Sequence, residues 1–112
     1  MKISIITITY NAAQWLERTM RSVLAQTSKD YEYIIVDGAS TDGTVDIIKR
    51  LEPQFEGRLS WHSEPDKGLY DAMNKGIERA VGEYVWFINA GDEIYNLDTL
   101  AHMIAAATDK TD

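Results

Sequence analysis

Short apolar runs alternate along the chain with longer segments in which apolar residues recur every three or four positions. Runs rich in β-branched and aromatic residues predict four buried strands, at residues 3–9, 31–36, 58–63 and 83–88. Segments with helical spacing predict four helices, at residues 13–26, 43–51, 69–81 and 97–107. The alternation of strand and helix predicts an α/β fold with a mostly parallel sheet flanked by helices.

The pattern also predicts which side chains form the core. In the helix at 69–81 the predicted core face is Leu69, Met73, Ile77, Ala80 and Val81. The three tryptophans, Trp15, Trp61 and Trp86, are interpreted as core residues. His62 and His102 are interpreted as structural, because neither has metal-ligand spacing to another ligand.

The length, composition and net charge of the chain exclude several classes of site and partner. A chain of 112 residues fits one domain. The absence of cysteine excludes disulfides and thiolate metal sites. A net charge of −7 argues against nucleic-acid binding and against a polybasic membrane patch. The apolar start is too short for a signal peptide, and no stretch reaches the ~20 apolar residues of a membrane span, so we expect a cytoplasmic segment.

Polar residues follow the end of every predicted strand. They are Thr9, Tyr10 and Asn11 after the first, Asp37 after the second, Glu64, Asp66 and Lys67 after the third, and Asn89, Gly91 and Asp92 after the fourth. Ligands of open parallel sheets bind beyond the carboxyl ends of the strands, so this convergence indicates a site. Turns and caps use the same residue types, and that reading stays open.

The nature of the ligand follows partly by exclusion. The turn after the first strand has no glycine, so the dinucleotide pattern G-x-G-x-x-G is missing, and a P-loop is absent as well. A nucleotide held without a Gly-rich loop would need carboxylates that bind a divalent cation to neutralise its diphosphate. Asp37, Asp71 and Asp92 are the candidates.

Five segments carry a family resemblance. They are I-I-T-I-T-Y-N at 5–11, S-V-L-A-Q at 22–26, Y-I-I-V-D-G-A-S-T-D-G-T at 33–44, S-E-P-D-K-G-L-Y-D-A-M-N-K-G-I at 63–77 and G-E-Y-V-W-F-I-N-A-G-D at 82–92. In this order and spacing they resemble the family 2 glycosyltransferases of the GT-A fold. The block at 63–77 resembles a subgroup with the pattern E-P-D-K-G-x-Y-D-A-M-N-K-G, found in bacterial exopolysaccharide and lipopolysaccharide clusters.

The resemblance implies a Rossmann-like GT-A half that binds a nucleotide-sugar, and it implies the role of single residues. The implied nucleotide-sugar-binding residues are Thr9, Tyr10, Asn11, Asp37, Lys67, Asp71, Asn74, Asn89 and Gly91. Asp37 is implied to meet the base, expected to be uracil, and Asp92 is implied to bind Mg²⁺ or Mn²⁺. For each residue a structural role as turn former, packed aromatic or solvated helix face is the alternative.

The chain departs from the family pattern at three points. The family often has two aspartates after the second strand, and here the second is Gly38. The two aspartates of its D-x-D motif fall on Asn89 and Gly91, with Asp92 one place further on. No residue can be carried over as the catalytic base, which is expected beyond residue 112.

These observations predict an inverting glycosyltransferase of the hexosyltransferase type. It would move a sugar from a nucleotide-sugar to a hydroxyl of a glycan or lipid-linked acceptor in bacterial polysaccharide synthesis. Residues 1–112 would form the donor-binding domain, inactive alone and cut before the acceptor-binding half. Membrane contact, at the inner face, would be made only through the missing parts. The alternatives are a nucleotide-binding module without catalysis and a structural α/β domain that binds nothing.

Overall fold

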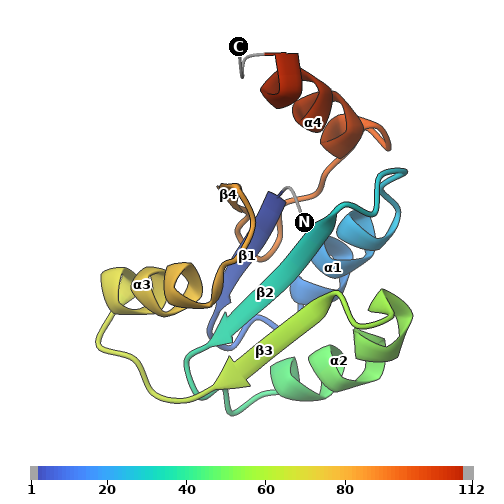
Figure 1. Cartoon of the computed structure of the whole chain (residues 1–112). Coiled ribbons are helices and arrows are strands. Elements are labelled where there is room, and N and C mark those ends of the chain that lie inside the picture. The colour runs from blue at the N-terminus through green and yellow to red at the C-terminus, as the bar shows by residue number, and fades with distance from the viewer. Residues whose placement is uncertain (1–2, 110–112) are drawn as a thin grey trace.

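The computed structural model describes residues 3–109 and has the predicted α/β architecture (Figure 1). The strands are β1 (Ile3–Thr9), β2 (Tyr31–Asp37), β3 (Leu59–Ser63) and β4 (Tyr84–Phe87). The helices are α1 (Leu16–Leu24), α2 (Thr44–Leu51), the 3₁₀ helix η1 (Glu52–Phe55), α3 (Leu69–Arg79) and α4 (Thr99–Asp109). The fold-class prediction is confirmed.

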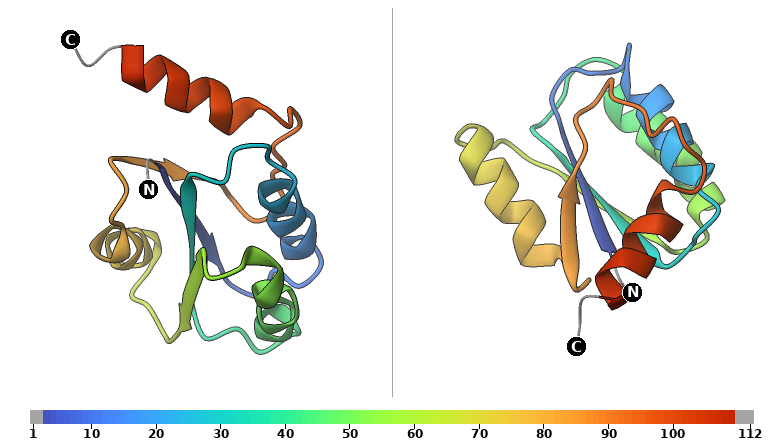
Figure 2. Two further views of the ribbon diagram at one scale, coloured as in Figure 1. Left: turned by 45° about the vertical axis from the view of Figure 1, so that its right-hand side comes forward. Right: turned by 90° about the horizontal axis from the view of Figure 1, so that it is seen from above.

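The four strands form one parallel sheet in the order β3-β2-β1-β4. Helices α1 and α2 cover one face, and among the helices of residues 3–109 only α3 covers the other (Figure 2). Helix α4 lies near the amino ends of the strands, away from the edge toward which β1, β2 and β3 point. None of the helices within residues 3–109 is long and apolar enough to span a membrane.

The main core lies between the sheet and the α1–α2 layer. Odd-numbered residues of β1 and β2 point into it, because successive side chains of a strand face opposite sides. Its buried members include Ile3, Ile5, Leu16, Met20, Val23, Tyr31, Tyr33, Ile35, Ile48, Leu51 and Phe55. The segment 96–100 is joined to this layer by the fully buried Gln26, whose amide donates to the Asn96 carbonyl (2.9 Å) and accepts from the Leu100 N–H (3.0 Å).

The core on the α3 face is smaller, with the buried residues Ile6, Ile34, Val36 and Ala72. Helix α3 turns Ala72 and Gly76 toward the sheet, and a Cβ at Gly76 would lie 2.8 Å from Cγ2 of Ile6. Small residues thus bring the helix close to the strands. The predicted core face of α3 is therefore wrong in its large members: Leu69, Ile77 and Val81 are exposed.

Two further predictions need correction. Helix α1 begins at Leu16 instead of residue 13. The preceding N–H groups of Ala12 and Ala13 bond to the side chains of Thr44, at the start of α2, and of Asp42, in the loop before it. Trp15 is 47% exposed and is no core residue, whereas Trp61 and Trp86 pack against the main core as expected.

Candidate functional site

The ends of three strands meet at one edge of the sheet. In the parallel register Thr9 pairs with Asp37, and Asp37 pairs with Ser63. The loops that follow these residues therefore leave the sheet side by side. This carboxyl edge is where a parallel sheet binds its ligands.

The loops after β1 and β2 are tied together by their own polar groups. Oδ1 of Asn11 accepts the N–H of Thr41 (2.8 Å), and the N–H of Asn11 donates to Oγ of Ser40 (2.8 Å). Asn11 adopts a left-handed backbone (φ 48°), which asparagine tolerates better than most residues. The structure thus gives Asn11 a clear structural role, and its contact with a nucleotide stays a prediction.

Two further hydrogen bonds connect the segment after β1 to the segment after β2. The N–H of Ala12 donates to Oγ1 of Thr44 (2.9 Å), and the N–H of Ala13 donates to Oδ2 of Asp42 (3.2 Å). The other carboxylate oxygen of Asp42 accepts the hydroxyl and the N–H of Thr44. The Thr44 hydroxyl, followed by the backbone donors, lowers the pKa of Asp42. Residues 40–44 of the motif therefore hold the loops after β1 and β2 in place.

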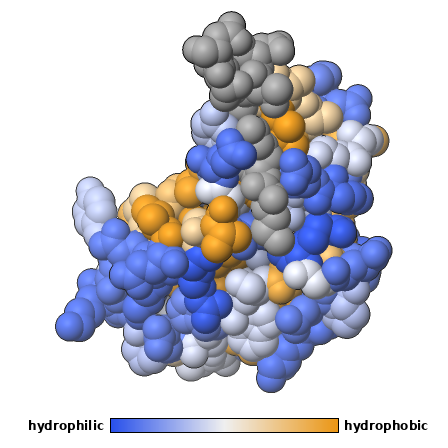
Figure 3. Space-filling view, viewed as in Figure 1, coloured by the Kyte–Doolittle hydropathy of each residue, from blue (hydrophilic) through white to orange (hydrophobic). Residues whose placement is uncertain are grey.

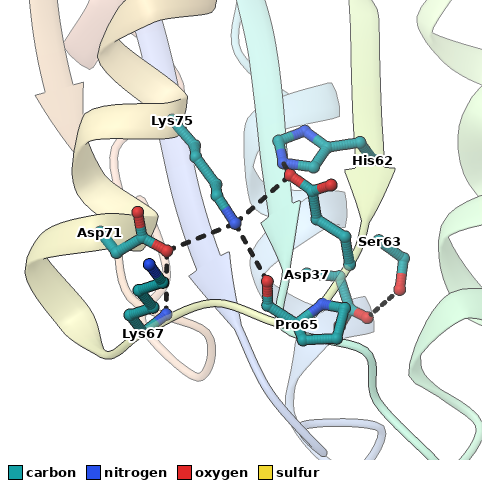
Figure 4. A network of polar contacts seen from close by, with 8 residues as sticks. Asp37, His62, Ser63, Pro65, Lys67, Asp71 and Lys75 are labelled. Carbon is teal, nitrogen blue, oxygen red and sulfur yellow. Dashed lines mark hydrogen bonds and ion pairs between the residues drawn. The ribbon is translucent and has the colours of Figure 1, made fainter.

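Asp37 is fully buried at the end of β2. Its carboxylate accepts the hydroxyl of Ser40 (2.5 Å), the N–H of Ser40 (2.9 Å) and the hydroxyl of Ser63 (2.7 Å), the last of which is drawn in Figure 4. Three donors satisfy the charge that burial would otherwise penalise. In this arrangement Asp37 supports the loop behind the site, and the direct contact with a base that the resemblance implies stays a prediction.

A cavity of about 360 Å³ opens at the carboxyl end of β1, next to the start of α3. Its lining residues are Ile8, Thr9, Tyr10, Asp66, Gly68, Leu69 and Ala72. The Tyr10 side chain is 64% exposed, so its ring is accessible to a ligand. The hydroxyl oxygen of Thr9 is buried and has no hydrogen-bond partner among residues 3–109. The structure thus brings Thr9 and Tyr10 together in a mostly apolar cavity.

The loop between β3 and α3 is held by charged groups around Lys75 (Figure 4). The Lys75 ammonium lies 3.3 Å from Glu64, 3.4 Å from Asp71 and 3.1 Å from the carbonyl of Pro65. Asp71 also accepts the backbone N–H of Lys67 (2.8 Å). This bond and then Lys75 lower the pKa of Asp71. Burial works against the charged Lys75, but its carboxylate partners outweigh it and raise the pKa.

Of the residues predicted on this loop and helix, Asp71 therefore shapes the loop. The side chains of Lys67 and Asn74 are exposed. A smaller cavity of about 210 Å³ is lined by His62, Glu64, Lys75, Glu78 and Arg79. Of the polar residues predicted at the strand ends it includes Glu64, and it includes none of the implied nucleotide-sugar-binding residues. Burial, followed by the charge of Arg79, lowers the pKa of His62.

The turn at Asn89–Asp92 follows β4 on the side of α1. The N–H of Asp92 donates to the Asn89 carbonyl (3.0 Å), and the N–H of Gly91 donates to Oγ1 of Thr19 (2.7 Å). Gly91 has a left-handed backbone (φ 103°), and a Cβ there would lie 3.5 Å from Cβ of Trp15. A side chain at position 91 would be strained in this backbone conformation.

Asn89 and Asp92 are both exposed, and Asp92 with Gly91 lines a cavity of about 300 Å³. No three His, Cys, Asp or Glu side chains in the described part of the chain lie close enough to form a metal site of their own. One carboxylate and one amide oxygen are hard donors that suit Mg²⁺ or Mn²⁺ when phosphate oxygens and waters complete the shell. The residues present fit a cation that arrives with a diphosphate.

Sequence reasoning missed Asp66 as a site residue, although it placed Asp66 after the third strand. Asp66 lines the cavity beside Tyr10 and comes within 2.8 Å of the point where a Cβ of Gly38 would be. The available signal was the exchange of an aspartate for Gly38, which leaves space at the end of β2.

Comparison with known proteins agrees with this geometry. A family model described as Glycosyl transferase family 2 matches residues 4–112. A PGL/p-HBAD biosynthesis glycosyltransferase of Mycobacterium tuberculosis is 43% identical over 102 residues, which cover 91% of this chain and 40% of that protein. An uncharacterized glycosyltransferase of the same species is 40% identical over 109 residues, covering 96% of this chain and 40% of that protein. The chain thus spans about 40% of the length of these relatives.

Solved structures show the same fold. Residues 1–349 of TarS from S. aureus, in complex with UDP-GlcNAc, superpose with a TM-score of 0.89 at 28% identity, over 97% of this chain and 32% of that one. The mannosyltransferase PcManGT of Pyrobaculum calidifontis, in complex with GDP-Man and Mn²⁺, superposes with a TM-score of 0.87 at 30% identity, over 98% of this chain and 33% of that one.

Proposed function

Because the chain belongs to glycosyl transferase family 2, we propose that it is the donor-binding part of an inverting enzyme that uses a nucleotide-sugar, with a UDP-sugar as the first candidate. The observation that carries the proposal is the cavity at the carboxyl end of β1, where the accessible Tyr10 stands beside apolar side chains and a carboxylate. A planar base fits such a cavity, because aromatic stacking and a few polar contacts hold nucleobases.

In this proposal the base lies against Tyr10, and the diphosphate runs along the carboxyl edge toward the Asn89–Asp92 turn. The exposed ammonium of Lys67 stands on the loop beside the cavity and offers a positive charge to the diphosphate. Asn89 and Asp92 would hold a divalent cation together with the phosphate oxygens. When bound, that cation supplies the positive charge that stabilises the departing nucleoside diphosphate.

The proposed reaction is transfer of the sugar to an acceptor hydroxyl with inversion. A carboxylate base removes the proton of the hydroxyl while its oxygen attacks the anomeric carbon, and the nucleoside diphosphate leaves from the opposite side. We assign no residue of this chain as the base. A glycan or lipid-linked acceptor in bacterial surface-polysaccharide synthesis, reached from the cytoplasmic side of the membrane, completes the proposal. The support for this setting is the resemblance of residues 63–77 to one subgroup.

Calorimetric titration of UDP, once with Mn²⁺ and once with a chelator, tests the donor site. We expect Mn²⁺ to tighten UDP binding by at least about 10-fold, and linkage requires UDP to tighten Mn²⁺ equally. Asp92→Asn should remove the difference. Asp46→Asn, which changes the charge equally at an exposed position of α2, should keep it.

Each part of the proposal has its own contrary result. A wild-type chain that binds neither UDP nor GDP in either buffer contradicts donor binding. Equal UDP affinities with Mn²⁺ and with chelator contradict the cation site alone. Donor binding without any transfer by the full-length protein would favour the second candidate, a nucleotide-binding module.

A further inference from the structure

We infer that Asp66 is the residue that reads the nucleobase, and that it does so in a space left open by Gly38. This inference rests on the proposed function, because it assigns the base specificity of the same cavity. The sequence places Asp66 after the third strand and Gly38 after the second, but it does not show that the two residues meet. The assignment comes from three observations on the contacts around Asp66.

The first observation is the space above Gly38. A Cβ at this residue would lie 2.8 Å from Oδ2 of Asp66 and 3.5 Å from Cδ1 of Tyr10. Gly38 is not among the residues with a left-handed backbone, so space and not conformation requires glycine here. The Asp66 carboxylate therefore lies where a side chain at the end of β2 would otherwise extend, beside the ring of Tyr10.

The second observation is the unequal use of the two Asp66 oxygens. Oδ1 accepts the N–H of Gly68 (3.1 Å) and so closes the loop before α3. Oδ2 accepts no hydrogen bond from any residue between 3 and 109. Because Asp66 lines the 360 Å³ cavity, one carboxylate oxygen remains available to a ligand there.

The third observation separates Asp66 from Asp37. Successive strand residues face opposite sides of a sheet, and the odd-numbered Tyr33 and Ile35 belong to the core on the α1–α2 face. Asp37 continues that series, and both of its carboxylate oxygens accept hydrogen bonds from Ser40 and Ser63. Asp66 is thus the carboxylate beside the cavity, and Asp37 lies behind it.

The chemistry of a carboxylate defines the base that it selects. An ionised carboxylate only accepts hydrogen bonds, so it pairs with a ring N–H. Uracil and thymine offer N3–H, and guanine offers N1–H. Cytosine presents an unprotonated N3 at the same edge, which would face the carboxylate lone pairs. The ligand class is therefore a nucleoside diphosphate whose base carries a ring N–H.

Asp66→Asn tests this assignment, because asparagine keeps an oxygen for the Gly68 N–H and places an NH₂ donor where Oδ2 was. We expect wild type to bind UDP at least about 10-fold more tightly than CDP. In the variant, UDP affinity should fall by about 10- to 100-fold, the range for a lost charged hydrogen bond, while CDP affinity holds or rises. A purely structural role for Asp66 would lower both affinities by the same factor.

Gly38→Ala is the second variant, because its methyl group must displace the Asp66 carboxylate. We expect a loss of UDP affinity of about 5-fold or more, at the low end of the effect of losing the bond outright. Gly43→Ala is the matched control: its Cβ would meet only Cβ of Ala13, at 3.8 Å, and UDP affinity should not change.

The outcomes distinguish this inference from the function on which it rests. A wild-type chain that binds no nucleoside diphosphate overturns both. A wild type that binds UDP, together with an Asp66→Asn variant of unchanged UDP-to-CDP preference, overturns the role of Asp66 and leaves the donor site standing. A preference that shifts toward CDP in Asp66→Asn, with Gly43→Ala unchanged, supports the inference.

Discussion

On one face of the sheet, helices α1, α2 and η1 bury large side chains against the strands. On the opposite face, α3 contacts the strands mainly through the small residues Ala72 and Gly76. The second face leaves Ile77, Val81 and Val85 exposed, and Figure 3 shows hydrophobic surface gathered over α3 and β4. The cavity with Tyr10 and Asp66 lies on this thinner side.

The two faces of the sheet therefore have different roles: one supplies most of the stability, and the other carries the proposed ligand site. Apolar burial is the dominant stabilising contribution in folding, so the α1–α2 layer should hold most of the stability. The α3 face then presents a ligand site with few large side chains anchoring it. Asn11 and Asp42 accept hydrogen bonds that join the loops after β1 and β2, and Asp37 accepts one from Ser63 of β3. These bonds hold the carboxyl edge of the sheet in shape.

The largest loss of stability should come from truncating a side chain in the main core, between the sheet and the α1–α2 layer. Leu16→Ala removes a fully buried side chain of the main core and should lower the free energy of unfolding by about 2–5 kcal/mol. Ile77→Ala on α3, where the side chain is 47% exposed, should cost less than about 1 kcal/mol. Urea denaturation of both variants measures the difference, and equal losses would show that the two faces contribute alike.

A smaller effect should follow from changing the polar support of the carboxyl edge. Asp37→Asn turns one oxygen into a donor that faces the hydroxyl or N–H donors of Ser40 and Ser63, and leaving one such buried group unpaired costs about 1–3 kcal/mol. We expect the free energy of unfolding to fall by more than the free energy of UDP binding does. The exposed Asp46→Asn is the control for charge. A variant of unchanged stability that no longer binds UDP would instead place Asp37 in contact with the base.

The sequence predicted the fold well because its strongest signals are local. Apolar runs of strand length report the strands directly, and their alternation with helices implies the parallel sheet. The packing of α3 was mispredicted because spacing alone does not say which of two adjacent stripes faces the sheet. Ala72 and Gly76 are inside because the backbone approaches Ile6 closely, which no hydropathy pattern encodes.

The site shows the same limit. The pattern predicted that Thr9, Tyr10 and Asp37 lie at the carboxyl ends of strands, and the structure adds that Thr9 pairs with Asp37 across neighbouring strands. Which aspartate lies beside the cavity did not follow, because Asp66 and Gly38 are 28 positions apart and meet only in the fold. The burial of Asp37 depends on Ser63 of a different strand in the same way.

The most direct test of the account is UDP titration of Tyr10→Ala against Tyr84→Ala. Both variants remove a partly exposed tyrosine ring, one beside the cavity and one on the edge strand β4. Loss of a stacked base contact of about 1–3 kcal/mol should weaken UDP binding by about 5- to 100-fold in Tyr10→Ala, while Tyr84→Ala should bind as the wild type does. Wild-type affinity in Tyr10→Ala would contradict a nucleotide site at the carboxyl end of β1.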